Sequence, residues 1–180
     1  VSLPFFGVCT AMFLVGLYFV GQGDVVLPKA LFLQAAADGG RGGSWVAGLG
    51  SVYLAAMIVL TVRGFLRAAV LSGPGHGLKS AGVRWSVGVL YFDVDDREAF
   101  HMPNTLNTRF GIVGLLVPAA LGGIFALIGA VNGQINMGAW VLTAWLILFL
   151  DLCPFLPTDG ARLVELATSV SRQRYRVRTY

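Results

Sequence analysis

Four long apolar runs alternate with polar segments along this chain of 180 residues. The runs cover residues 4–20, 45–62, 110–131 and 137–155. Each is close to the roughly 20 apolar residues that cross the hydrocarbon of a bilayer as a helix. Because lipid cannot hydrogen-bond an exposed backbone, such runs are expected to be helical. The pattern therefore predicts an all-α membrane protein with about four transmembrane helices.

A different period occurs in the polar segment between the second and third runs. Residues 83–92 read VRWSVGVLYF, in which every second position holds valine or an aromatic residue. These positions are Val83, Trp85, Val87, Val89 and Tyr91. A period of two predicts an extended strand or a hairpin. We expect a small cytoplasmic β-like segment whose alternate face packs on the cytoplasmic ends of the helices.

Composition and charge agree with a single membrane domain over residues 1–180. Only 12% of the residues are charged, against roughly 25% in a soluble domain. Lys and Arg concentrate in the loop 63–109 and in the tail 161–180, whereas the loop 132–136 carries no charge. The positive-inside rule then places the central loop, the tail and both termini in the cytoplasm. We expect an integral protein of the bacterial cytoplasmic membrane, with lipid and other membrane subunits as partners and no nucleic acid.

The most specific local pattern lies at the end of the fourth run. Residues 150–163 read LDLCPFLPTDGARL, in which two prolines break the helix near the membrane boundary. Asp151 and Asp159 are thereby placed at that boundary. Ionisable residues at membrane depth are costly and are candidates for function.

This segment resembles the NxxPxxxxDG segment of site-2 protease-like intramembrane zinc metalloproteases, in particular the putative peptide zinc metalloprotease branch. Residues 88–96, GVLYFDVDD, are similar to that branch's G-x-x-L-Y-F followed by an acidic turn. The order of spans also agrees, and the resemblance covers about residues 52–170. It implies a zinc ion held by two histidines of HExxH and by the DG aspartate, which corresponds to Asp159.

The zinc-binding motif itself is missing, because no HExxH occurs in the chain. In one placement, residues 63–67, RGFLR, occupy its position, so that Arg63 and Arg67 replace the histidines and Gly64 replaces the glutamate. In the other, residues 72–76, SGPGH, occupy it and retain only His76. We favour the first, because it lies on the span and keeps the i, i+4 spacing. Arginine is always protonated and cannot bind a cation, so the resemblance implies a pseudoprotease with no cofactor and no enzymatic activity.

Three functions are left open by these residues. The first is a catalytically inactive scaffold or subunit of a larger membrane complex. The second is a transport or export subunit unrelated to proteases. The third is a metalloprotease with altered zinc ligands, for which His76, His101 and Asp159 are the candidates.

The arginines of the degenerate motif suggest what replaced the metal. A partly buried carboxylate that has lost its cation needs another positive partner. We expect Arg63 or Arg67 to pair with Asp151 or Asp159, since a guanidinium matches a carboxylate well. The alternative is that these arginines extend to lipid phosphates at the helix end.

The predicted topology can be tested by cysteine labelling. A single cysteine placed at Asn132 or Asn136 should react with a membrane-impermeant maleimide added from outside the cell, because the uncharged loop is expected to be external. Reaction only after the cytoplasmic side is opened would overturn the topology.

Overall fold

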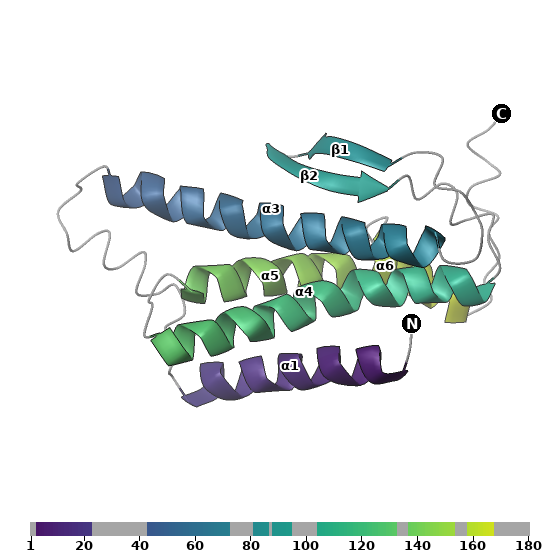
Figure 1. Cartoon of the computed structure of the whole chain (residues 1–180), viewed down its shortest axis with the longest axis horizontal. Helices are drawn as coiled ribbons and strands as arrows, with labels where there is room; N and C mark the ends of the chain where they lie inside the picture. The colour runs from purple at the N-terminus through teal and green to yellow at the C-terminus, as the bar shows by residue number, and fades with distance from the viewer. Residues whose placement is uncertain are drawn as a thin grey trace.

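The computed structural model describes residues 3–22, 43–72, 81–86, 88–94, 104–132, 137–153 and 158–167. These residues form five helices and one antiparallel hairpin (Figure 1). The helices are α1 (Leu3–Gln22), α3 (Gly43–Ser72), α4 (Asn104–Asn132), α5 (Met137–Leu152) and α6 (Asp159–Ala167). The strands are β1 (Ala81–Ser86) and β2 (Val89–Val94).

Three helices, α1, α3 and α4, are long and apolar enough to cross a bilayer. Helix α5 is apolar but has only 16 residues, which corresponds to about 24 Å of rise. Helix α1 begins at the end of the bundle where α3 ends and α4 begins (Figure 1). The helical membrane class predicted from the sequence agrees with these lengths, and the fourth predicted span is the short helix α5.

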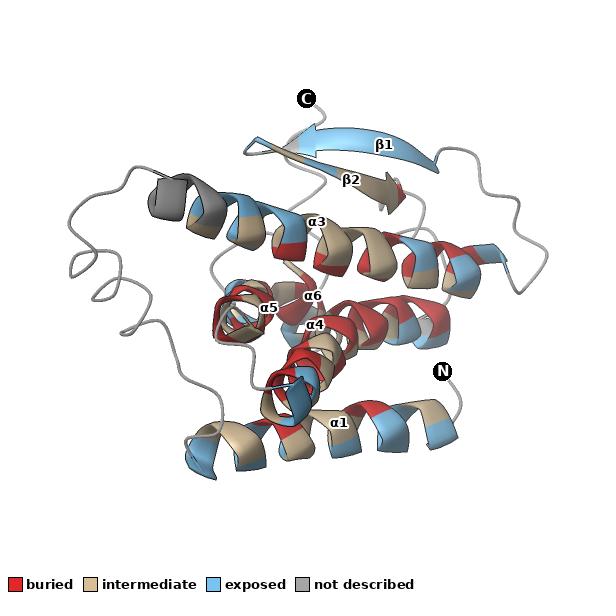
Figure 2. Ribbon diagram, turned by 60° about the vertical axis from the view of Figure 1, so that its left-hand side comes forward, coloured by how far each residue is buried: buried red, intermediate tan, exposed pale blue. Residues whose placement is uncertain are grey.

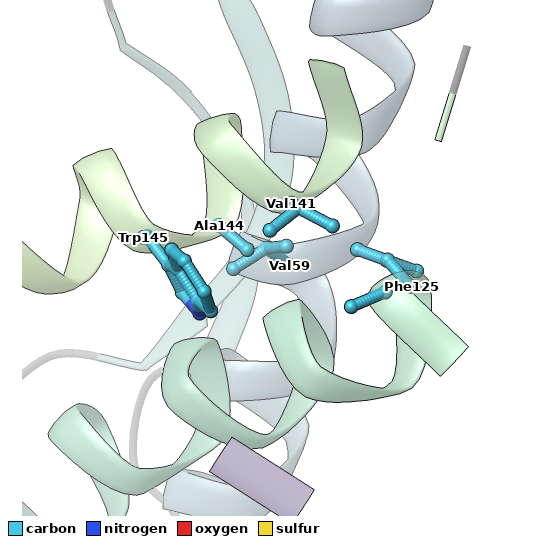
Figure 3. Close-up of a cluster of buried hydrophobic side chains, with 6 residues drawn as sticks. Val59, Phe125, Val141, Ala144 and Trp145 are labelled. Carbon is cyan, nitrogen blue, oxygen red and sulfur yellow. The ribbon is translucent and has the colours of Figure 1, made fainter. Parts of the chain in front are cut away.

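Helix α4 lies at the centre of the bundle, with α1 on one side and α3 and α5 on the other (Figure 2). Large and small side chains interlock in its core, as Figure 3 shows for the cluster that joins α3, α4 and α5. The buried members are Val59, Phe125, Ala126, Val141, Ala144 and Trp145. Phe13 of α1 meets the edge of Trp145 with ring centroids 5.8 Å apart. Dispersion between well-packed side chains drives this association in lipid, where burial from water contributes little.

Helix α3 extends ten residues beyond Val62, where its predicted span ended. It continues to Ser72, so the first part of the predicted loop 63–109 is helical. The charged residues that suggested a loop, Arg63 and Arg67, are buried inside the bundle. The predicted tail likewise begins as helix, because α6 extends to Ala167.

The period-two segment is a hairpin. Strands β1 and β2 pair from Ala81↔Val94 to Ser86↔Val89, so two residues form the turn. Gly88 has φ 79°, a left-handed conformation that glycine adopts without steric cost and that two-residue hairpins require.

The face of the hairpin that was predicted to pack on the helices, with Val83, Trp85 and Tyr91 on one side, was wrong. The turn changes which residues share a side of the sheet. Directly paired residues point to the same side, so Val83 lies on the side of Phe92, and Trp85 on the side of Leu90. Val83 is 75% exposed and Trp85 65% exposed. Contact with the helices is made by β2 instead, through Phe92 and the buried Val94.

Strand β2 lies along α3 (Figure 1). The rings of Phe65 and Phe92 stack with centroids 4.3 Å apart. At Gly64 the two backbones approach so closely that a β-carbon would overlap the carbonyl group of Phe92. Gly64 is therefore the residue that allows the hairpin to dock on the helix.

Replacing Gly64 by Ala should loosen the hairpin and destabilise the fold by about 1–3 kcal/mol, the usual cost of overpacking. Gly50→Ala on the same helix is the matched control, because a β-carbon there meets nothing within 4 Å. That change should be neutral or slightly stabilising, since Ala favours helix over Gly. Reversible unfolding in mixed micelles measures both variants, and equal effects would contradict the close approach at Gly64.

Candidate functional site

Side chains from three helices meet at the end of the bundle where α3 approaches α6. The Nη1 atom of Arg63 lies 2.5 Å from Oδ2 of Asp151, at the end of α5. The Nη2 atom of the same guanidinium lies 2.9 Å from Oδ2 of Asp159, the first residue of α6. Arg67, one helical turn further along α3, also forms an ion pair with Asp159. We call these four residues the charge cluster.

All four members of the charge cluster are buried, at 6–9% exposure. An isolated charge in such a place costs several kcal/mol, because the apolar interior does not replace its hydration. Each charge here has an opposite charge in contact. The arginines therefore do not extend to lipid phosphates, which was the alternative left open by the sequence.

The spacing of the two arginines explains why both reach one carboxylate. Residues four apart on a helix lie on the same face, and this face of α3 is directed at Asp159. The position of Asp159 at the start of α6 adds a smaller effect, because the positive end of a helix dipole favours a carboxylate.

Two glycines make room for the charge cluster. A β-carbon at Gly114 of α4 would overlap the carboxylate of Asp159 and lie 2.7 Å from Nη2 of Arg67. A β-carbon at Gly160 would lie 2.6 Å from the carbonyl oxygen of Asp151. The Asp-Gly pair at the start of α6 thus provides a carboxylate and a close backbone approach to α5 in two consecutive residues.

An aromatic ring lies between two guanidinium groups beside the charge cluster. The Cζ atom of Arg67 is 4.9 Å from the ring centroid of Phe110, and that of Arg162 is 5.2 Å away. Phe110 is fully buried, and cation–π attraction strengthens when the cation is desolvated. The sequence did not point to Phe110, Arg162 or Gly114, since nothing in an apolar run marks which residue will face a distant cation.

The side chains at this site do not fit a bound zinc ion. Guanidinium groups have no lone pair for a metal, and both carboxylates already accept from arginine. Within the described parts of the chain, no group of three His, Cys, Asp or Glu side chains is placed to hold a metal. The other proposed ligands, His76 and His101, lie outside the described residues, as does most of the alternative motif 72–76.

The chain was also compared with known proteins. No protein-family model, no curated protein and no solved structure matched it.

Removal of Arg63 should destabilise the bundle strongly. Arg63→Ala leaves Asp151 without its contacting cation, and breaking a buried pair in this way costs about 3–5 kcal/mol. Arg84→Ala is the control: its ion pair with Asp93 spans 3.0 Å but the Arg84 side chain is 58% exposed. An exposed pair contributes about 0–1 kcal/mol.

Unfolding of both variants in mixed micelles gives the comparison. A loss for Arg63→Ala no larger than that for Arg84→Ala would show that the buried contacts do not stabilise the fold.

Proposed function

We propose that this chain is a non-catalytic relative of the site-2 protease-like intramembrane metalloproteases, and that it serves as a scaffold subunit of a larger membrane complex. The observation that carries the proposal is the convergence of Arg63 and Arg67 on the carboxylate of Asp159. In the resembled family, the residues at these positions are the two histidines and the aspartate that share a zinc ion. A direct pair of opposite charges here occupies the place that the resemblance assigns to the metal.

A second difference from the resembled segment supports the same proposal. The NxxPxxxxDG pattern begins with asparagine, and this chain has Asp151 at that position. Asp151 contacts Arg63. An added negative charge beside an added positive charge keeps the buried site near neutrality, which is the condition for placing ions in an apolar interior.

The chemistry of the site favours binding over hydrolysis. Peptide hydrolysis by this family needs a Lewis acid and a general base for water. Arg63 and Arg67 provide neither, and Gly64 stands at the position of the base with the backbone of Phe92 packed against it. Both carboxylates form ion pairs with guanidinium groups.

The interior of the bundle also favours a scaffold over a transporter. Transport of ions or polar solutes through a bundle requires polar groups along a path. Among the described residues, the buried charges lie together at one end, and the cluster of Val59, Phe125 and Trp145 fills the interior between α3, α4 and α5 (Figure 3). This packing gives a rigid body with its outer surface available to other membrane proteins.

The relation to a metal site can be tested by restoring the histidines. The double variant Arg63→His, Arg67→His places two imidazoles and Asp159 around one point, a ligand set that binds zinc in catalytic sites. We expect roughly one zinc ion per chain in this variant by elemental analysis, and only trace metal in the wild type. Adding Asp159→Asn should abolish the binding.

Two results would count against the relation to metalloproteases: no zinc in the double variant when it is folded, or stoichiometric zinc in the wild type. The scaffold role needs a separate measurement. Crosslinking in the native membrane followed by quantitative purification should give a defined membrane partner in fixed ratio. A chain that remains monomeric and uncrosslinked would contradict that role.

A further inference from the structure

The central helix of the bundle, α4, contains a proline. Pro118 lies inside the helix, and its side chain is fully buried. Proline has no N–H, and its ring crowds the carbonyl one turn back, so the helix loses one hydrogen bond at this point. The carbonyl that loses its donor is that of Gly114, at position i−4. In a membrane-spanning helix such a carbonyl needs another polar partner, because lipid offers none.

Arg67 of α3 lies beside this carbonyl group. A β-carbon at Gly114 would lie 2.7 Å from Nη2 of Arg67, so the guanidinium contacts the backbone of α4 where the hydrogen bond is broken. A guanidinium has five N–H donors. Asp159 contacts Nη2, and Nε of Arg67 is buried with no acceptor among the residues that the structure describes. Arg67 therefore has spare donors next to the acceptor that Pro118 releases.

The part of α4 that precedes Pro118 packs closely on α6. A β-carbon at Gly111 would lie 3.1 Å from the side chain of Leu163, and one at Gly114 would overlap the carboxylate of Asp159. Both of these neighbours belong to α6. The first part of α4 and α6 therefore form one packed unit at the charged end of the bundle.

The part of α4 that follows Pro118 packs on other helices. A β-carbon at Gly122 would overlap the indole of Trp145 on α5, and one at Gly123 would overlap the carbonyl of Met12 on α1. The buried apolar cluster between α3, α4 and α5 also lies beyond the proline, since Phe125 is among its members from α4. The break in the helix thus separates two parts of α4 with different neighbours.

We propose that α4 is hinged at residues 114–118 and that Arg67 is the latch of this hinge. In the closed arrangement, Arg67 binds Asp159 of α6 and compensates for the donor that the carbonyl of Gly114 has lost. When a partner draws Arg67 away from these two groups, the bend of α4 changes and its first part moves together with α6. The part beyond Pro118 stays with α1 and α5.

The hinge gives the charge cluster a role in motion in addition to its role in stability. Sharp bends in helices occur mostly at proline, and packed interfaces switch between discrete arrangements instead of deforming continuously. Removal of one guanidinium is therefore expected to release a defined movement of the charged end. This inference rests on the packing of α4 and does not require the relation to metalloproteases.

Distances between pairs of spin labels test the hinge. The full chain, with Cys9 and Cys153 replaced by Ala, is placed in phosphatidylethanolamine–phosphatidylglycerol vesicles and labelled at two introduced cysteines. The hinge pair joins Leu14 of α1 to Arg109 in the first part of α4, and the control pair joins Leu14 to Val131 in the second part. All three positions are exposed. Pulsed electron paramagnetic resonance then gives the distribution of each distance.

Arg67→Met should broaden the distribution of the hinge pair, because the latch is lost, and should leave the control pair unchanged. Adding Pro118→Ala should narrow the hinge pair again, because alanine donates the missing hydrogen bond to Gly114. Arg63→Met is the matched control: it removes another buried cation from Asp159, but Arg63 is not among the nearest neighbours of a β-carbon at Gly114. Any broadening that it causes should remain after Pro118→Ala is added.

Three results would overturn the proposal. The first is a wild-type distribution for Arg67→Met in a chain whose near-ultraviolet circular dichroism shows that it is folded. The second is broadening that persists when Pro118→Ala is added to Arg67→Met. The third is equal broadening of the control pair, which would indicate general loosening of the bundle.

A second variant covers the case in which Arg67→Met does not fold. Arg67→Lys keeps the positive charge but lacks the planar fork of donors. It should broaden the hinge pair less than full loss of the latch would, and Pro118→Ala should again remove the broadening. Failure of this rescue would equally contradict the hinge.

Discussion

The fold depends on keeping four charges together where water does not reach. Arg63 and Arg67 project from the last third of the continuous helix α3, and Asp151 and Asp159 stand at a helix end and a helix start. None of these groups is stable alone in an apolar interior, so the four must be desolvated together. This requirement fixes the rotation of α3 about its axis and the position of α6 against α5. It also explains why α4 has glycine at position 114, since a larger residue would separate Arg67 from Asp159.

The same constraint connects the charge cluster to the hairpin. Because Arg63 and Arg67 face inward, the residues between them turn outward, and Gly64 and Phe65 meet β2. One turn of helix therefore has two functions. Its inner face holds the aspartates, and its outer face holds the hairpin. A substitution that rotates this turn of α3 would disturb both contacts. It would therefore destabilise the hairpin and the charge cluster together.

The sequence was informative where a single strong physical effect decides the outcome. Hydrocarbon requires long apolar helices, so the runs at residues 4–20, 45–62 and 110–131 could be placed to within a few residues at most ends. The i, i+4 spacing of Arg63 and Arg67, combined with the Asp-Gly pair at residues 159–160, pointed to the part of the chain where the buried ion pairs are found. Charge at membrane depth is rare enough to be noticed in a single sequence.

The sequence was less informative where the outcome depends on distant partners, on turn geometry or on how helices cross. Arg63 looked like the end of a span, because burial of an arginine depends on partners that lie about 90 residues away. The hairpin face was assigned to the wrong residues, because a two-residue turn at Gly88 changes which positions share a side. The contacts of Phe110 depend on how α4 crosses α3, and a local pattern does not carry that information.

Arg67 and Asp159 are expected to stabilise the bundle through each other. A double-mutant cycle with Arg67→Met and Asp159→Asn measures this coupling directly, since effects on the rest of the fold cancel. We expect a coupling free energy of at least about 1.5 kcal/mol, as found for close charge pairs in desolvated contacts. Strict additivity, with a coupling below about 0.5 kcal/mol, would contradict this expectation, because it would show that the two residues stabilise the fold independently.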